Sequence, residues 1–254
     1  MLLDRLVPRV DLVVDPEDRE PIIVLLTATV LLVVFFYWGR PGFYYDGDIV
    51  GWVRANASGL VAGDPTVGAY LWWGATSLVL RVIAPLAVIV VALRRSPRDF
   101  GFRVRGTLRH LPAYGALYLV MLPILVVVSG TQSFLSYYPS YDNAARGGLT
   151  FWLYEFGYAL QFVGVEAFFR GFLTFGLYRR FGILSVVIMT IPYTMIHFAK
   201  PAPEAFAAII AGLVLGVMAL RSRSFVPGIV LHVAVAITMD LLVLWRVGAL
   251  GNVL

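Results

Sequence analysis

A set of ionisable residues interrupts otherwise apolar stretches in the C-terminal half of the chain. The set includes Glu166, Arg170, His197, His232 and Asp240. Titratable groups inside membrane-spanning segments are energetically costly, and they usually pair with one another or serve a function. A carboxylate or an imidazole can activate water, and an imidazole or a protonated acid can stabilise an oxyanion. The set therefore predicts hydrolysis or proton transfer inside a membrane.

The spacing of these residues indicates which of them share a helix face. Glu166 and Arg170 are four residues apart, so they lie on one face in the favourable order for an ion pair. His232 and Asp240 are two helical turns apart and fall near one face of another helix. Structural alternatives exist at this point: an ion pair that joins two helices, and an interfacial position for His197, which Lys200 follows closely.

Depth along the helices indicates whether the groups can meet. Measured from the arginines that flank each segment, Glu166, His197 and Asp240 reach similar depths, within about one helical turn of each other. His232 lies about two turns nearer to the arginines than Asp240 does. These residues can therefore line one cavity.

The composition predicts an all-α, polytopic transmembrane helix bundle of about seven spans. Of 254 residues, 60% are hydrophobic and only 14% are charged, and the mean hydropathy is +0.83. A soluble domain carries about a quarter charged residues. A helix needs about 20 apolar residues to cross the bilayer and pairs its own backbone groups there. The expected spans are residues 22–38, 70–93, 111–129, 150–177, 183–198, 205–220 and 226–245.

The basic residues predict the orientation of the bundle, because cytoplasmic loops are enriched in arginine and lysine. With the N-terminus in the cytoplasm, the cytoplasmic segments hold Arg5, Arg9, Arg19, Arg94, Arg95, Arg98, Arg103, Arg105, Arg109, Arg179, Arg180, Arg221 and Arg223. The opposite side holds Arg40, Arg54, Arg146, Lys200 and Arg246. The net charge of +5 then reports topology and contact with membrane lipids, and no nucleic-acid partner is expected. The arginine bias favours a bacterial inner membrane.

Two further patterns constrain the packing and the chemistry. Small residues recur at Gly157, Gly164 and Gly171 and again at Gly212 and Gly216, which predicts close helix contacts. The chain has no cysteine, so a thiol nucleophile and cysteine metal ligands are excluded.

Three short motifs follow one another in the C-terminal half, and together they resemble those of the CPBP family. This family comprises CAAX-protease and bacteriocin-processing (Abi) intramembrane proteases. Its Glu-Glu-x-x-x-Arg motif is matched by Glu166 and Arg170, its aromatic-x-x-x-His motif by Tyr193 and His197, and its His-x-x-x-Asn motif by His232. The resemblance covers residues 150–245 and implies a division into an N-terminal segment with three helices (1–149) and a catalytic core of four helices (150–254).

Two positions depart from the family pattern. The family's first glutamate, which is assigned to water activation, is Val165 here, and its asparagine is Ala236. Either Glu166 has taken over the role of base or the chain is an inactive relative. Asp240, one turn beyond Ala236, can replace the lost asparagine. Glu204 is a further carboxylate near His197, with a solvated charge at a helix start as its structural alternative.

The resemblance implies an intramembrane endopeptidase that cleaves a membrane-anchored or lipidated protein near its C-terminus. In this interpretation Glu166 is the general base, Arg170 positions it and His197 assists. His232 donates to the oxyanion, and Asp240 orients His232 or, if protonated, donates a hydrogen bond itself. No cofactor is expected, and the departures favour a myxosortase-like branch that processes protein sorting signals.

Other functions remain open at the level of sequence. A zinc site would use His197 and His232 with a carboxylate from Glu166 or Asp240, although no short metal-binding pair of the H-E-x-x-H type is present. An inactive membrane scaffold or chaperone would account for Val165. A proton-coupled transporter would use the buried acids and histidines as a relay, and a haem protein would use the two histidines.

Overall fold

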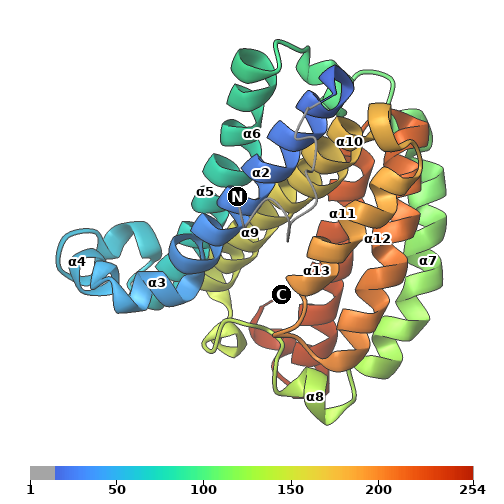
Figure 1. The fold of residues 1–254 in the computed structure, drawn as a ribbon. Coiled ribbons are helices and arrows are strands. Elements are labelled where there is room, and N and C mark those ends of the chain that lie inside the picture. Colours follow the sequence, from blue (N-terminus) through green and yellow to red (C-terminus); the bar gives the residue numbers. More distant parts are fainter. Residues whose placement is uncertain (1–14, 254) are drawn as a thin grey trace, which may run out of the picture.

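The computed structural model describes residues 15–253, and every regular element in this range is a helix (Figure 1). The prediction of an all-α fold is therefore confirmed. The α-helices are α2 (Arg19–Val34), α3 (Pro41–Asp46), α4 (Ile49–Asn56), α5 (Gly68–Leu78), α6 (Ala84–Ala87), α7 (Leu111–Val128), α8 (Gln132–Leu135), α9 (Gly148–Val165), α10 (Thr174–Phe181), α11 (Leu184–Met195), α12 (Ala202–Ser222) and α13 (Val226–Arg246).

Wider, π-type turns continue several of these helices without a break, and short 3-10 turns flank others. The π-type segments are η2 (Phe35–Gly39), η5 (Val79–Ile83), η6 (Val88–Ala92) and η10 (Glu166–Leu173). The 3-10 turns are η1 (Pro16–Asp18), η3 (Ser58–Val61), η4 (Pro65–Val67), η7 (Pro97–Phe100), η8 (Leu108–His110), η9 (Ala144–Arg146) and η11 (Leu250–Asn252).

Six helices of the described part are long and apolar enough to cross a membrane. They are Pro16–Gly39, Pro65–Ala92, Leu111–Val128, Gly148–Phe181, Ala202–Ser222 and Val226–Arg246. The predicted span at 183–198 is instead the 12-residue helix α11, about 18 Å long at 1.5 Å per residue, against a hydrocarbon core of about 30 Å. Six full spans and one short helix agree with the prediction of about seven, and the chain is a multi-pass membrane protein.

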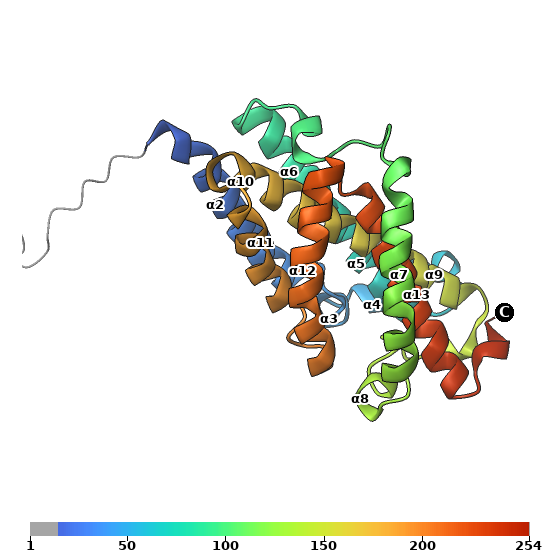
Figure 2. The same ribbon diagram turned by 90° about the vertical axis from the view of Figure 1, so that its right-hand side faces the viewer.

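The helix that runs through α9, η10 and α10 is the centre of the bundle. It is 34 residues long, and 83% of its most apolar stretch is buried inside the protein. In Figure 1, α2 and α5 lie on one side of it and α11, α12, α13 and α7 on the other, and Figure 2 faces this second layer. Within that layer α11 packs against α12 and α13 packs against α7. Side chains on the central helix are therefore enclosed by protein on both sides.

Glycines allow the closest helix contacts, as their spacing predicted. A Cβ atom on Gly157 would lie 2.5 Å from the backbone oxygen of Tyr70, and one on Gly164 would overlap Ser77. Ser77 also donates a hydrogen bond to the backbone oxygen of Gln161 at 3.1 Å. On the other side of the bundle, a Cβ on Gly216 would lie 2.6 Å from Val186. These contacts hold α5 against α9 and α12 against α11.

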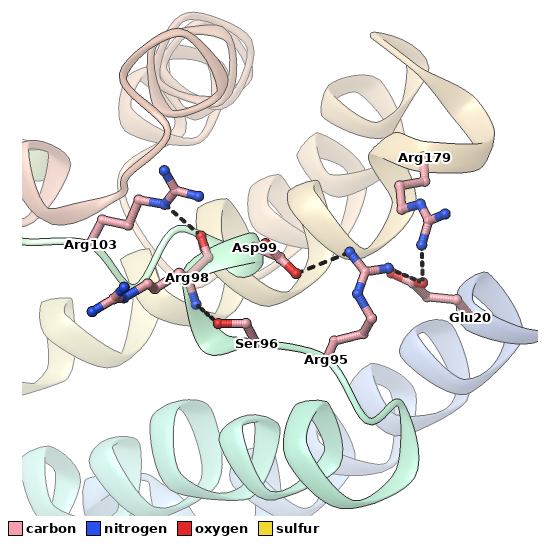
Figure 3. Close-up of polar contacts among 7 residues, drawn as sticks. All are labelled: Glu20, Arg95, Ser96, Arg98, Asp99, Arg103 and Arg179. Atoms are coloured by element: carbon pink, nitrogen blue, oxygen red, sulfur yellow. Dashed lines mark hydrogen bonds and ion pairs between the residues drawn. The ribbon is translucent and has the colours of Figure 1, made fainter.

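The arginine-rich end of the bundle is held together by ion pairs between its loops (Figure 3). Arg95 lies 3.1 Å from Glu20 and 3.2 Å from Asp99, and Arg179 lies 3.6 Å from the same Glu20. Of the predicted cytoplasmic arginines, Arg95 and Arg179 thus pair with one acid where α2 begins and α10 ends. Arg5 and Arg9 lie outside the described residues.

Replacement of Gly157 by alanine should destabilise the protein, because overpacking a tight contact costs about 1–3 kcal/mol. The matched control is Gly115→Ala, since Gly115 lies in α7 and a methyl group added there would meet no other atom within 4 Å. Alanine at such an open helix position is favoured over glycine by about 0.5–1 kcal/mol. Thermal unfolding in detergent should therefore shift in opposite directions for the two variants. Equal midpoints would show that the α5–α9 contact is not tightly packed.

Candidate active site

A cavity of about 980 Å³ lies between η2, α3, η5, the central helix and the end of α11. Its lining includes seven acidic, basic or amide side chains: Arg40, Asp46, Arg81, Gln161, His197, Lys200 and His232. The volume is at the upper end of the range for ligand pockets, about 300–1,000 Å³. The turn that follows the short helix α11 borders the cavity and places the side chain of His197 in the interior.

Glu166, Arg170 and His232 meet directly, as their depths allowed. Nδ1 of His232 lies 2.9 Å from Oε1 of Glu166, and Nη1 of Arg170 lies 3.4 Å from the same oxygen, at ion-pair distance. Glu166 and Arg170 are both fully buried. Oε2 of Glu166 has no hydrogen-bond partner within residues 15–253, and a Cβ on Gly228 would lie 2.6 Å from it. Glu166 is thus enclosed behind His232, which faces the cavity.

This arrangement defines the hydrogen-bonding state of His232. A carboxylate only accepts hydrogen bonds, so Nδ1 of His232 carries a hydrogen atom and donates a hydrogen bond to Glu166. In the neutral ring, Nε2 is then free to accept a proton. The ring also stacks on Phe162, with 4.3 Å between the centroids, which fixes its plane. His232 therefore presents a basic nitrogen held in one orientation.

Tyr193 connects Arg170 to His197. The guanidinium carbon of Arg170 lies 3.7 Å from the centre of the Tyr193 ring, and the Tyr193 and His197 rings meet edge to face. Nδ1 of His197 lies 2.9 Å from the backbone oxygen of Tyr193, so this nitrogen is the donor and Nε2 is the acceptor. His197 is only 6% exposed. It lies within the bundle and lines the same cavity as His232.

Asp240 belongs to a separate polar group about two turns farther along α13 than His232, where it contacts α9 at Tyr154. It accepts a hydrogen bond from the hydroxyl of Tyr154 at 2.6 Å, and the carboxyl of Glu155 lies beside it. Both acids are buried. No hydrogen bond joins Asp240 to His232 among the described residues. The expected role of Asp240 in orienting His232 is thus not supported by a direct hydrogen bond between the two side chains.

A smaller cavity of about 140 Å³ lies between α7, α12 and α13, and His232 lines it as well. Glu204 and Lys200 lie in its wall, 2.6 Å apart, and Tyr138 donates to Glu204 at 2.5 Å. Burial alone would lower the pKa of Lys200, but the nearby Tyr138, Tyr158 and Glu204 hold that pKa above its ordinary value. Lys200 is therefore a half-buried cation that borders both cavities.

The two positions that depart from the family pattern both face these spaces. Val165 lines the large cavity and Ala236 lines the small one. The alternative zinc site would need His197, His232 and a carboxylate together. Over residues 15–253 no three His, Cys, Asp or Glu residues gather closely enough to hold a metal ion. The carboxylates of Glu166 and Asp240 are engaged by His232 and Tyr154 instead.

Sequence reasoning missed several polar residues of the interior. Glu155 is an acid inside an apolar span, the same signal that drew attention to Asp240. Arg81 and Gln161 fall within predicted spans, but no motif or spacing in the sequence indicates a function for either residue. Both of these residues line the large cavity.

The buried ion pair can be tested by stability measurements. Glu166→Gln leaves Arg170 charged and enclosed without its partner, a change that costs about 3–5 kcal/mol for a buried pair. The double variant Glu166→Gln with Arg170→Met should recover much of the loss, because an apolar pair avoids the unpaired charge. Unfolding in detergent is the measurement. A Glu166→Gln midpoint equal to that of the wild type would contradict the ion pair.

Residues 147–238 match the family model described as type II CAAX prenyl endopeptidase Rce1-like. No curated protein and no solved structure matches the chain. The matched region includes Glu166, Arg170, Tyr193, His197 and His232, whereas Asp240 and Arg81 lie outside it. The resemblance of this region to the CAAX-protease (CPBP) family of membrane endopeptidases is therefore confirmed.

Proposed function

We propose that the protein is an intramembrane endopeptidase that hydrolyses a peptide bond near the C-terminus of a membrane-anchored or lipidated protein. The observation that carries this proposal is the hydrogen bond between buried Glu166 and His232, which lies in the wall of a large cavity within the bundle. The pair lies in the region that matches the CAAX endopeptidase model. A buried carboxylate that orients an imidazole is a recurrent device for proton transfer in hydrolysis.

In the proposed reaction His232 removes a proton from water through Nε2. The hydroxide attacks the carbonyl carbon of the scissile peptide bond, and His232 then returns the proton to the amide nitrogen as the C–N bond breaks. Glu166 stabilises the imidazolium that forms in between. This assigns Glu166 a positioning role behind His232, because its carboxylate is fully buried and does not line the cavity.

Other residues of the cavity wall supply the remaining functions. Nε2 of His197 can accept the second hydrogen of the attacking water and so orient it. Lys200 and Gln161 carry N–H donors for the oxyanion. They would replace the asparagine of the family motif, because this chain has Ala236 at that position. Arg170 neutralises Glu166 and stabilises the ionised form that accepts from His232.

A second function, that of a membrane scaffold or chaperone without hydrolysis, is favoured by one observation. Val165 faces the cavity at the place of the family's water-activating glutamate. The cavity would then bind a membrane-embedded peptide without cleaving it.

We also propose that the arginine-rich end faces the cytoplasm, and that the protein is located in a bacterial inner membrane. The large cavity includes Arg40, Asp46 and Lys200, which lie toward the opposite end of the bundle. In this orientation the cavity extends toward the outer side of the membrane, where C-terminal sorting signals of the myxosortase type would be processed.

Replacement of His232 by alanine should lower the rate of substrate processing by about 10²–10⁴-fold, the usual contribution of a general base. His197→Ala should cause a smaller loss. The matched control is His110→Ala, since His110 lies in the arginine-rich loop beside Arg109 and not in either cavity. The measurement is in-cell cleavage of a panel of proteins with C-terminal membrane anchors or prenyl groups. Each variant must accumulate in the membrane to wild-type level.

The variant Val165→Glu separates the two functions. If the wild type cleaves members of the panel and His232→Ala does not, the endopeptidase function is supported. If the wild type cleaves none and Val165→Glu cleaves some, the chain is a binding protein that lacks its base. Normal processing by His232→Ala would exclude the mechanism given above.

A further inference from the structure

Arg81 is a buried guanidinium in the wall of the large cavity. It lies in η5, within the span Pro65–Ala92, and only 3% of the residue is exposed. Its guanidinium carbon lies 3.5 Å from the centre of the Phe35 ring. Its Nε and Nη1 atoms are enclosed, and neither has a hydrogen-bond partner within residues 15–253. A cation in this position has donors but no acceptor.

The surroundings of Arg81 do not neutralise its charge. No carboxylate of the described residues lies within ion-pair distance of it, and Arg40, a second cation, lines the same cavity. Lys200 is paired with Glu204, and Asp46 is the acid that lines the cavity. The cation–π contact with Phe35 offers partial compensation but no hydrogen-bond acceptor. The cavity wall therefore holds more cations than anions, and no carboxylate of the described residues pairs with Arg81.

The depth of Arg81 restricts which anion can reach it. At 1.5 Å per residue, Arg81 lies about 20 Å along its helix from Arg94 and about 24 Å from Pro65. Glu166 lies a similar distance, about 20 Å, from Arg179 on the parallel central helix. A lipid phosphate remains at the edge of a hydrocarbon core about 30 Å thick. An anion that reaches Arg81 must therefore enter the cavity with an extended chain.

We propose that Arg81 binds the C-terminal carboxylate of the peptide that occupies the cavity. A guanidinium presents planar, paired donors that suit a carboxylate, and the bond is strongest where water is excluded. Gln161 lies in the same wall, and its side-chain amide nitrogen is a further N–H donor. This inference rests on the proposed endopeptidase function and adds a residue that selects free C-termini, outside the region matched by the family model.

A purely structural role for Arg81 gives different expectations. In that case the residue only joins η5 to η2 through the Phe35 ring. Phe35→Leu, which removes the ring and keeps the guanidinium, would then impair the protein as much as a change at Arg81. If Arg81 binds a carboxylate, Phe35→Leu lowers stability but preserves the preference for free C-termini.

The test compares two fluorescent, acyl-anchored decapeptides that differ only in a C-terminal carboxylate or amide. Their binding to the full-length protein in phosphatidylcholine nanodiscs is measured by anisotropy, and their hydrolysis is followed in parallel. The wild type should bind the carboxylate at least about tenfold more tightly, a difference of about 1.4 kcal/mol. Arg81→Gln should reduce the ratio to near one, and Arg81→Lys should retain part of it. Arg54→Gln, at an exposed position of α4, is the matched control and should leave the ratio unchanged.

The outcomes separate this inference from the proposed function. A preserved ratio in Arg81→Gln, with an unchanged unfolding midpoint, overturns the inference. An equal loss of affinity for the carboxylate and amide peptides in Arg81→Gln also overturns it. Such a loss indicates that Arg81 binds a lipid phosphate or supports the fold. An Arg81-dependent ratio without hydrolysis supports the carboxylate site and counts against the endopeptidase function alone.

Discussion

The fully buried ion pair of Glu166 and Arg170 is the constraint on which the rest of the interior depends. Two charges inside a membrane-embedded bundle persist only when each is enclosed by its partner and by polar or aromatic neighbours. The pair lies in η10 of the central helix, the most enclosed span, and Gly228 of α13 approaches the carboxylate closely. His232 and Tyr193 complete the enclosure. The groups that compensate this ion pair, His232 and Tyr193, are therefore held in fixed positions beside the cavity.

The cavity itself results from two irregularities in the helices. Helix α11 ends after 12 residues, and the turn that follows it borders the cavity and buries the side chain of His197. The central helix widens into a π-type turn at Glu166, and such turns often occur at functional sites because they redirect side chains. Together they leave a space bordered by His197 and His232. Regular helices of equal length would have filled it.

Sequence reasoning recovered the helices and the pairing of Glu166 with Arg170, because hydrophobic runs and four-residue spacing act locally. It also placed His197 and His232 in one cavity from their depths. It did not foresee that Glu166 lies behind His232, or that Asp240 contacts Tyr154 instead of the histidine. Both facts depend on the rotation of α13 against α9, which depth along a helix does not determine. The importance of Arg81 depends in the same way on which side of η5 faces the cavity.

His232 borders both the large and the small cavity, and Tyr158, Phe162 and Lys200 border both as well. The partition between the two spaces is therefore only about one layer of side chains thick. Whether the two cavities are connected therefore depends on very few side chains. A smaller side chain at position 232 would join two chambers into one, so this position governs the shape of the interior as well as its proton chemistry.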